Sequence, residues 1–310
     1  MVDVIKVGFI GLGNMGGAIA ERLARSSAVE LHVFDRNASA AERLERLGAI
    51  THPSARAVAE AARFVITCLP TVEATRSTLF DADGVMGGPA GARAVQHCVE
   101  MSTIGPTVMR EIAQRLADWQ IGMLDAPVSG GAAGALNGTL AIMIAGTLAV
   151  RDAVAPVLAA ISPKVFTISD VPGDAQTMKL VNNLLAAANM ATSFEALALG
   201  VKLGLAPEKI VEVINASSGR NTGMDERKTG SILARRFAGL GKISLLEKDI
   251  GLAFKVAVEA GFPLDAIPAF GGMAQLWQRA VAQGMASEDV SALIKVVERA
   301  ADVEVRGRST

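Results

Sequence analysis

Three glycines near the amino terminus have the spacing of a phosphate-binding turn. The run from Lys6 to Ile10 is rich in β-formers, and Gly11, Gly13 and Gly16 follow it at the start of a helical pattern. In a strand, turn and helix, the first glycine permits the tight turn, the second lets backbone approach a pyrophosphate, and the third lets helix and strand pack closely. We expect this turn to bind a dinucleotide through Gly11, Leu12, Gly13, Asn14, Met15 and Gly16.

An acidic residue follows where such a turn needs one. Asp35 ends the next strand-like run, Leu31 to Phe34, and dinucleotide-binding folds place an acid about 20 residues beyond the glycines to bind the ribose hydroxyls. The neighbouring Arg36 could stack on adenine, pair with a 2′-phosphate, or be solvated. The carboxylate predicts NAD as the cofactor, and Arg36 leaves NADP possible.

A second glycine turn carries one hydroxyl. Residues 125–131 read Asp-Ala-Pro-Val-Ser-Gly-Gly after a strand-like run. Such a sequence is often only a tight turn, but exposed N–H groups and the Ser129 hydroxyl could bind an anion such as a carboxylate. Ser129, Gly130 and Gly131 are therefore candidate substrate contacts.

Lys179 and Asn183 stand four residues apart in a long helical run that Pro172 and Gly173 open. At that spacing they share one face of the helix, and Asp174 could cap its start. A lone lysine at a helix start is more often a solvated surface residue. The two glycine turns favour a functional role for this one.

The elements that would position these residues alternate between strand and helix through the first half of the chain. Strands are expected at 64–69, 94–101, 121–124, 140–145 and 164–168, with helices at 72–79, 106–118 and 151–160 between them. This alternation predicts a doubly wound parallel sheet of the Rossmann type. Ligands bind beyond the carboxyl ends of such strands, so Leu69, Pro70 and Thr103 are further candidate cofactor contacts.

The second half is expected to be helical throughout. From Met178 to Leu203 the sequence is apolar nearly all round, which predicts a buried helix joining two domains; its polar interruptions argue against lipid. Further helices are expected at 207–215, 230–237, 245–260, 266–283 and 287–301. We predict a dinucleotide-binding domain at 1–171, an all-helical domain at 172–302, and a frayed tail at 303–310.

Composition favours small-molecule chemistry. The 310 residues carry a net charge of −1, which gives no electrostatic footprint for nucleic acid or an anionic membrane surface. Two cysteines and three histidines are scattered without metal-ligand spacing, so no metal site is predicted. The start of the chain lacks a basic and apolar targeting segment, which predicts a cytoplasmic protein. The apolar helical half predicts a homodimer or homotetramer.

With these residues in hand, the chain resembles the β-hydroxyacid dehydrogenase family along almost its whole length. Residues 8–16 resemble the family's cofactor loop, and 125–131 resemble its substrate-carboxylate loop. Residues 173–183 resemble its catalytic segment, although Ala175 stands where the family usually has a second glycine. Lys248 and Asp249 resemble the family's C-terminal motif, in which the lysine reaches the cofactor.

The resemblance implies a hydride transfer between a nicotinamide and a small β-hydroxy acid or its semialdehyde. In that reaction Lys179 is implied to be the general acid/base, with Asn183 orienting the substrate beside it. The substrate carboxylate would be held at Ser129 and the glycine N–H groups.

Two other classes share this architecture. Imine reductases usually replace the lysine, so Lys179 counts against them, and a non-catalytic dinucleotide-binding module has no need of Lys179, Asn183 and Ser129 together. The sequence does not name the acid. Arg220, Asn221 and Met224 are candidates for side-chain selectivity.

Overall fold

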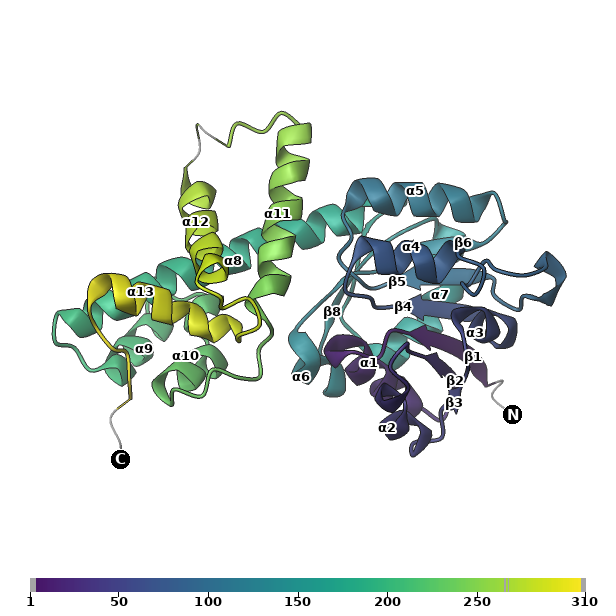
Figure 1. Ribbon diagram of the computed structural model, residues 1–310, viewed down its shortest axis with the longest axis horizontal. Coiled ribbons are helices and arrows are strands. Elements are labelled where there is room, and N and C mark those ends of the chain that lie inside the picture. The colour runs from purple at the N-terminus through teal and green to yellow at the C-terminus, as the bar shows by residue number, and fades with distance from the viewer. Residues whose placement is uncertain (1–3, 265, 267, 308–310) are drawn as a thin grey trace. The chain divides into compact units, whose positions relative to one another are not determined.

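Strand β1 (Ile5–Ile10) lies near the centre of a parallel sheet in the computed structural model, which describes residues 4–264, 266 and 268–307 (Figure 1). The strand order β3-β2-β1-β4-β5-β6 is that of a dinucleotide-binding fold. All five neighbouring pairs in this part of the sheet are parallel. The other strands of this set are β2 (Val29–Phe34), β3 (Ile50–Thr51), β4 (Phe64–Thr67), β5 (His97–Glu100) and β6 (Gly122–Asp125).

The predicted parallel sheet of the Rossmann type is confirmed for β1 to β6, and the sheet departs from it beyond β6. Strand β8 (Ala141–Ala145) pairs antiparallel with β6 and with β7 (Val128–Ser129), and β9 (Val165–Ser169) pairs parallel with β8. The helix before β8, α6 (Gly131–Leu136), has 6 residues. At 1.5 Å per residue it advances only about 9 Å, which is too short to return the chain along a strand that rises about 3.3 Å per residue.

Two hydrophobic cores cover the two faces of the sheet because successive strand residues point to opposite sides. Phe64 and Ile66 lie in one core and Val65 in the other. The first core is completed by α1 (Asn14–Ala24), α2 (Glu42–Glu45), α6 and α7 (Leu148–Ile161), and the second by α3 (Ala55–Ala61), α4 (Val72–Phe80) and α5 (Pro106–Ala117).

Helix α8 (Asp174–Lys202) leads into a separate helical unit, and the chain divides after Lys179. The predicted division lay after Val171, but the first turns of α8 belong with the sheet. The rest of the unit comprises α9 (Pro207–Asn215), α10 (Glu226–Leu233), α11 (Ile243–Glu259), α12 (Ala269–Ala282) and α13 (Ile294–Ala301).

The core of the helical unit is built around Trp277, which is fully buried. Phe194 and Leu197 of α8 lie in the same core, so α8 is a core helix of this unit, although its length and composition would also suit a membrane span. Packing therefore explains the apolar residues on one side of the helix. The prediction of a fully buried helix was wrong in part, since Val181, Leu185 and Leu199 are exposed.

One predicted helix end and the predicted tail differ from the structure. The helix expected at 230–237 ends at Leu233, since Arg235 and Phe237 take left-handed backbone angles, with φ of 54° and 49°. The predicted tail is partly ordered: Val305 is buried, and the Gly307 N–H donates to the Leu233 carbonyl at 2.9 Å. The described residues do not include the last three, 308–310. They also leave out 265 and 267, near the expected start of the 266–283 helix.

Candidate active site

The first glycine turn has the geometry that the spacing predicted. Gly11 has φ +96°, and a Cβ there would lie 2.4 Å from the Cys68 carbonyl oxygen; a Cβ on Gly16 would lie 1.9 Å from the Gly11 carbonyl oxygen. A Cβ on Gly13 would meet no atom of the described protein within 4 Å. Gly11 and Gly16 are thus required by the fold, while Gly13 leaves open space where a ligand can approach the backbone.

The amino terminus of α1 beside this space is free to receive an anion. Gly13 is its N-cap residue, no side chain among the described residues caps the helix, and its first turn contains no acidic residue. Gly13 and Asn14 are exposed. The unpaired N–H groups of a helix start bind phosphate well, so these residues fit the diphosphate of a dinucleotide.

Asp35 stands directly after β2 and bonds to the glycine turn. One carboxylate oxygen accepts from the Leu12 N–H at 2.6 Å, and the other accepts from the Asn37 N–H at 2.8 Å. Each oxygen keeps acceptor capacity for a ribose hydroxyl. Asp35 therefore also fixes the turn, a role that the sequence did not predict, and Arg36 beside it is exposed.

The last residues of three neighbouring strands form a polar row at the carboxyl edge of the sheet. Thr67 lies opposite Glu100, and Glu100 lies opposite Asp125 in the parallel register. The Glu100 carboxyl accepts from the Thr67 hydroxyl at 2.8 Å and from the Ser102 N–H at 2.7 Å. Burial raises the pKa of Glu100 to about 7; hydrogen bonds from Ser102 and Thr67 oppose the rise and the Asp125 charge adds to it.

This row supports the loops that were predicted to touch the cofactor. The Ser102 hydroxyl accepts from the Leu69 N–H at 2.7 Å, and Leu69 Cδ2 lies 2.9 Å from the position of a Cβ on Gly11. Thr103, which is half-buried, follows Ser102 directly, and Pro70 is exposed after Leu69. The structure therefore brings Leu69 beside the glycine turn, at the edge where such sheets bind ligands.

The second glycine turn follows Ser129 at the end of β7. Gly130 and Gly131 have φ of +134° and +71°, which side chains rarely adopt. Ser129 and Gly131 are half-buried and Gly130 is exposed. The turn is accessible, and its binding of a carboxylate stays a prediction.

Asp125, and not Asp174, accepts the hydrogen bonds at the start of α8. Its Oδ2 atom accepts from the N–H groups of Gly173 at 2.8 Å and Gln176 at 3.1 Å. Asp174 instead bonds to Arg110 at 3.1 Å and to Ser169 at 2.7 Å. Burial raises the pKa of Asp125 to about 6, although hydrogen bonds from the Gln176 side chain and the first backbone N–H groups of the helix oppose the rise.

Ala175, where the resemblance implied a glycine, fits this arrangement. Its methyl group is fully buried and packs with Met143 and Ala145 of β8. Its N–H is among the groups that bond Asp125. The methyl therefore adds contact with the sheet and does not disturb the helix start.

Lys179 and Asn183 lie one helical turn apart on α8, on opposite sides of the point where the chain divides. In the helical unit the Asn183 side-chain amide donates to Asp249 Oδ2 at 2.7 Å. The other oxygen of Asp249 lies 3.2 Å from Lys248 Nζ. Asp249 thus links two predicted site residues, and the sequence signal for it was only its place beside Lys248.

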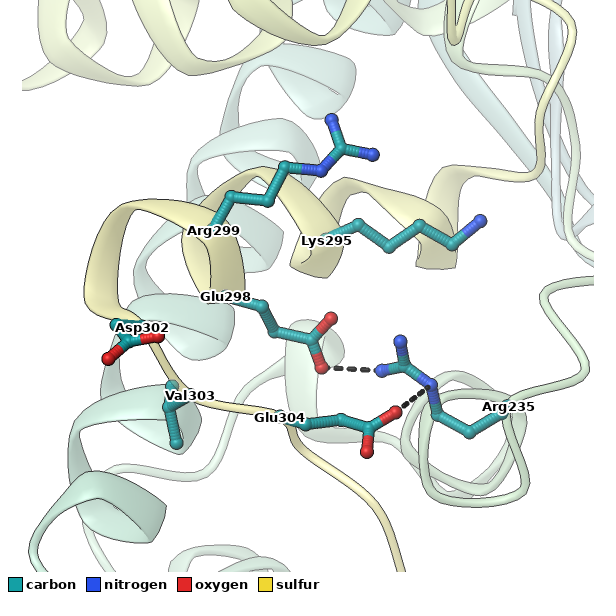
Figure 2. Close-up of a pocket in the computed structure, with 7 residues that line it drawn as sticks. All are labelled: Arg235, Lys295, Glu298, Arg299, Asp302, Val303 and Glu304. Carbon is teal, nitrogen blue, oxygen red and sulfur yellow. Dashed lines mark hydrogen bonds and ion pairs between the residues drawn. The ribbon is translucent and has the colours of Figure 1, made fainter.

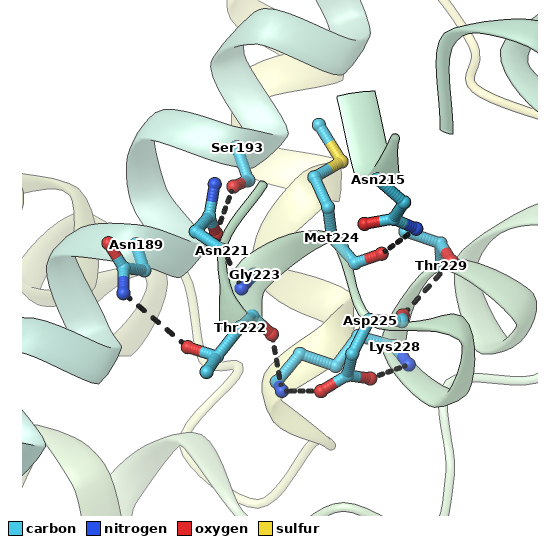
Figure 3. Close-up of polar contacts among 10 residues, drawn as sticks. All are labelled: Asn189, Ser193, Asn215, Asn221, Thr222, Gly223, Met224, Asp225, Lys228 and Thr229. Atoms are coloured by element: carbon cyan, nitrogen blue, oxygen red, sulfur yellow. Dashed lines mark hydrogen bonds and ion pairs between the residues drawn. The ribbon is translucent and has the colours of Figure 1, made fainter. Parts of the chain in front are cut away.

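The three residues proposed for selectivity have different surroundings in the helical unit, and Figure 3 shows two of them, Asn221 and Met224. Asn221 accepts from the Ser193 hydroxyl at 2.9 Å and from the Gly223 N–H at 2.7 Å. Met224 is 1% exposed and lies in the core. Asn221 therefore holds its loop against α8 and Met224 packs the unit; of the three, Arg220 is exposed.

Two cavities in the described part of the chain lie apart from these residues. One of about 550 Å³ is in the helical unit, where Arg235 pairs with both Glu298 and Glu304 (Figure 2). The other, of about 520 Å³, is a mainly apolar groove in the sheet unit between α5, α7 and Pro172. Two further charges of the first cavity pair with residues outside its lining, Lys295 with Glu288 and Asp302 with Lys202. Neither cavity is lined by a predicted site residue.

Comparisons with known proteins cover both units. Residues 6–169 match the model for the NAD binding domain of 6-phosphogluconate dehydrogenase. Residues 173–297 match the model for the NAD-binding region of NADP-dependent 3-hydroxyisobutyrate dehydrogenase. Solved imine reductases are more distant: one from a Pseudomonas species is 18% identical with a TM-score of 0.61, covering 95% of this chain and 99% of that one. This likeness shows the fold alone.

Relatives with higher sequence identity are named as dehydrogenases of small hydroxy acids. The 2-(hydroxymethyl)glutarate dehydrogenase of Eubacterium barkeri is 37% identical over 311 residues, with 99% of each chain covered. The 3-hydroxyisobutyrate dehydrogenase of Pseudomonas aeruginosa is 36% identical over 269 residues, covering 84% of this chain and 89% of that one. The solved 3-hydroxyisobutyrate dehydrogenase of Salmonella typhimurium has a TM-score of 0.83 and 30% identity, covering 94% of this chain and 99% of its own. The chain therefore belongs to the β-hydroxyacid dehydrogenase family and is a nicotinamide-dependent dehydrogenase acting on the hydroxyl group of a small hydroxy acid.

Proposed function

We propose that Lys179 is the general acid/base of this dehydrogenase and that its substrate is a β-hydroxy acid held by its carboxylate. The observation that carries the proposal is the bonding of α8: the helix bearing Lys179 is held by Asp125 at the sheet edge where the glycine turn leaves space for a dinucleotide. The proposed proton donor and the proposed cofactor site would thus share one edge of one unit.

The residues would divide the chemistry as follows. Gly13, Asn14 and Asp35 would hold the dinucleotide, whose nicotinamide accepts or delivers the hydride when bound. Lys179 would take the proton from the substrate hydroxyl in oxidation, and its ammonium would stabilise the developing alkoxide in reduction. Ser129 and the N–H groups of Gly130 and Gly131 would bind the carboxylate.

Asn183 would orient the substrate beside Lys179, and Lys248 would contact the cofactor. Support for Asn183 comes from Asp249, which accepts its amide hydrogen and so fixes which way the amide faces. The amide oxygen of Asn183 accepts from Asn182 at 3.1 Å and retains a second lone pair.

For the substrate we propose an acid with a primary alcohol on the carbon next to the one bearing the carboxylate. Two relatives have names that describe such compounds, 2-(hydroxymethyl)glutarate and 3-hydroxyisobutyrate. A panel of these acids, threonate, and tartronate and succinic semialdehydes, assayed with both NAD and NADP, would identify the preferred one. Cytoplasmic location and assembly into a homodimer or homotetramer remain predictions from the sequence.

Replacing the lysine tests the proposal. Lys179→Met keeps the length and apolar packing of the side chain, and general acid–base catalysis contributes about 10²–10⁴-fold. We expect kcat to fall at least about 100-fold on the best substrate of the panel, with NAD affinity by calorimetry nearly unchanged. Asn183→Ala should show a milder loss, since the asparagine transfers no proton.

A matched control lies on the same helix. Lys202, at the other end of α8, is exposed and donates to the Asp302 carbonyl, so Lys202→Met should keep wild-type turnover. If Lys179→Met also kept it, the assignment would be wrong, and Lys248 would be the next group to replace.

A further inference from the structure

The Gln176 side chain makes four hydrogen bonds between α8 and the sheet unit. Its Oε1 atom accepts from the N–H groups of Ile104 at 2.9 Å and Gly105 at 3.1 Å. Its Nε2 group donates to the Ser102 carbonyl at 3.1 Å and to Asp125 Oδ1 at 2.8 Å. These bonds use both donors and both lone pairs of the amide, and the side chain is fully buried.

Asp125 completes the attachment through the backbone of α8. Its carboxylate accepts from the N–H groups of Gly173 and Gln176, where the positive end of the helix dipole lies. Burying a carboxylate carries a cost in solvation free energy that an apolar pair would avoid. A buried, fully bonded acid and amide at a helix start therefore contribute little net stability. Their presence is explained if the exact placement of that helix matters.

The placement that matters is that of Lys179. It follows Gln176 by three residues, so the two lie on neighbouring turns of one helix face, with about 4.5 Å of rise between them. A catalytic group displaced by 1 Å can lose about 100-fold in rate. All of these contacts lie within the unit that also carries the glycine turn.

We propose that Gln176 and Asp125 are positioning residues that hold the turn of α8 bearing Lys179 at the carboxyl edge of the sheet. The inference rests on the proposed role of Lys179. Neither residue needs to touch substrate or cofactor; each acts through the helix. The four bonds of Gln176 set the distance from the strand ends, and the bonds to Asp125 set the direction in which the helix leaves them.

A double-mutant cycle separates positioning from general stability. Gln176→Met keeps the side-chain length and removes all four bonds. We expect kcat to fall about 10- to 100-fold, with the dissociation constant of NAD changed less than about 3-fold, because the glycine turn and Asp35 are untouched. In the Lys179→Met background the same change should alter the residual kcat less than about 2-fold, since no lysine is left to misplace.

Thr177→Val is the matched control. The hydroxyl of this exposed neighbour donates within the first turn of α8, to the Gly173 carbonyl at 3.1 Å. Removing that bond should leave kcat within about 2-fold of wild type. Should Gln176→Met fail to fold, Asp125→Asn takes its place in the cycle: the amide still accepts from the helix N–H groups but presents a second donor to Gln176 Nε2.

The positioning proposal would be overturned if Gln176→Met lowered kcat equally in the wild-type and Lys179→Met backgrounds, or if Gln176→Met alone kept wild-type turnover. In either case Lys179→Met would still be inactive, so the proposed function would stand. Failure of the proposed function looks different. In that case Lys179→Met itself would keep wild-type turnover, and Gln176 would have no catalytic group to place.

Discussion

Asp35 fixes the glycine turn and is also proposed to determine which cofactor binds. Its carboxylate accepts from the Leu12 and Asn37 N–H groups, and in the proposed cofactor site it would face the 2′-phosphate of NADP. Two unit charges about 4 Å apart interact by about 4 kcal/mol at an effective dielectric constant near 20. The proposed ribose contact would therefore favour NAD through this repulsion as well as through hydrogen bonds to the ribose hydroxyls.

We predict that the wild-type enzyme prefers NAD over NADP by at least about 100-fold in kcat/KM. Asp35→Asn keeps an oxygen for the Leu12 N–H and removes the charge, so the preference should shrink by at least about 10-fold. Arg36→Ala is the companion variant: if the guanidinium attracts a 2′-phosphate, its removal should increase the preference. A wild-type ratio in favour of NADP would show that the carboxylate does not face the phosphate.

At the scale of the element, the glycine turn contains two glycines that the fold needs, Gly11 and Gly16, and one, Gly13, that is proposed to serve the ligand. A Cβ at Gly16 would collide with the Gly11 carbonyl oxygen, whereas a Cβ at Gly13 would point into open space. The same substitution at the two positions should therefore fail in different ways.

Gly13→Ala is predicted to fold with a melting temperature within about 2 °C of wild type but to bind NAD at least about 10-fold more weakly, since a methyl group would occupy the space of the pyrophosphate. Gly16→Ala is predicted to lower the melting temperature by at least about 5 °C, because α1 must move away from the turn. Thermal melts and calorimetry on both variants measure the two effects. Tight NAD binding by Gly13→Ala would mean that the dinucleotide does not approach there.

The sequence predicted elements whose signals are local. Strand, glycine turn and helix from Lys6 to Ala24 were confirmed because glycine spacing and hydrophobic periodicity act over a few residues. The reversed direction of β8 was missed, since no local signal shows which way a chain returns after a short helix. The bond between Asp125 and the start of α8 was missed for the same reason: it joins residues far apart in the sequence, and the nearby Asp174 looked like the cap.

At the scale of the whole molecule, the buried carboxyl of Glu100 couples stability to pH. Burial raises its pKa from 4.5 to about 7 in the folded protein. Between these values the folded state binds more protons than the unfolded chain, so the free energy of unfolding falls as the pH rises, by up to about 1.4 kcal/mol per pH unit for this group. Asp125, raised to about 6, adds to the same trend.

Glu100→Gln imitates the protonated acid, and we predict that it is more stable than wild type at pH 8 and similar at pH 5. Its oxygen can accept from the Ser102 N–H, and its NH₂ can donate to Thr67, whose hydroxyl can turn to the Val99 carbonyl at 3.4 Å. Urea unfolding at pH 5, 6, 7 and 8 measures the difference. A variant with the same pH slope as wild type would show that Glu100 does not carry the proton.

The division of the chain inside α8 limits how this protein can exchange parts with its relatives. A sheet unit cut at the loop before Gly173 would lose the N–H groups and the amide that satisfy Asp125, and a helical unit cut at Leu180 would start with bare N–H groups in the middle of a helix. Recombination that replaces the helical half from the loop onwards would bring in the helix of a relative together with its lysine. The first N–H groups of that helix would still have to donate to Asp125. Positions 125 and 176 therefore have to be inherited as a matched pair, although one is encoded in each half of the gene.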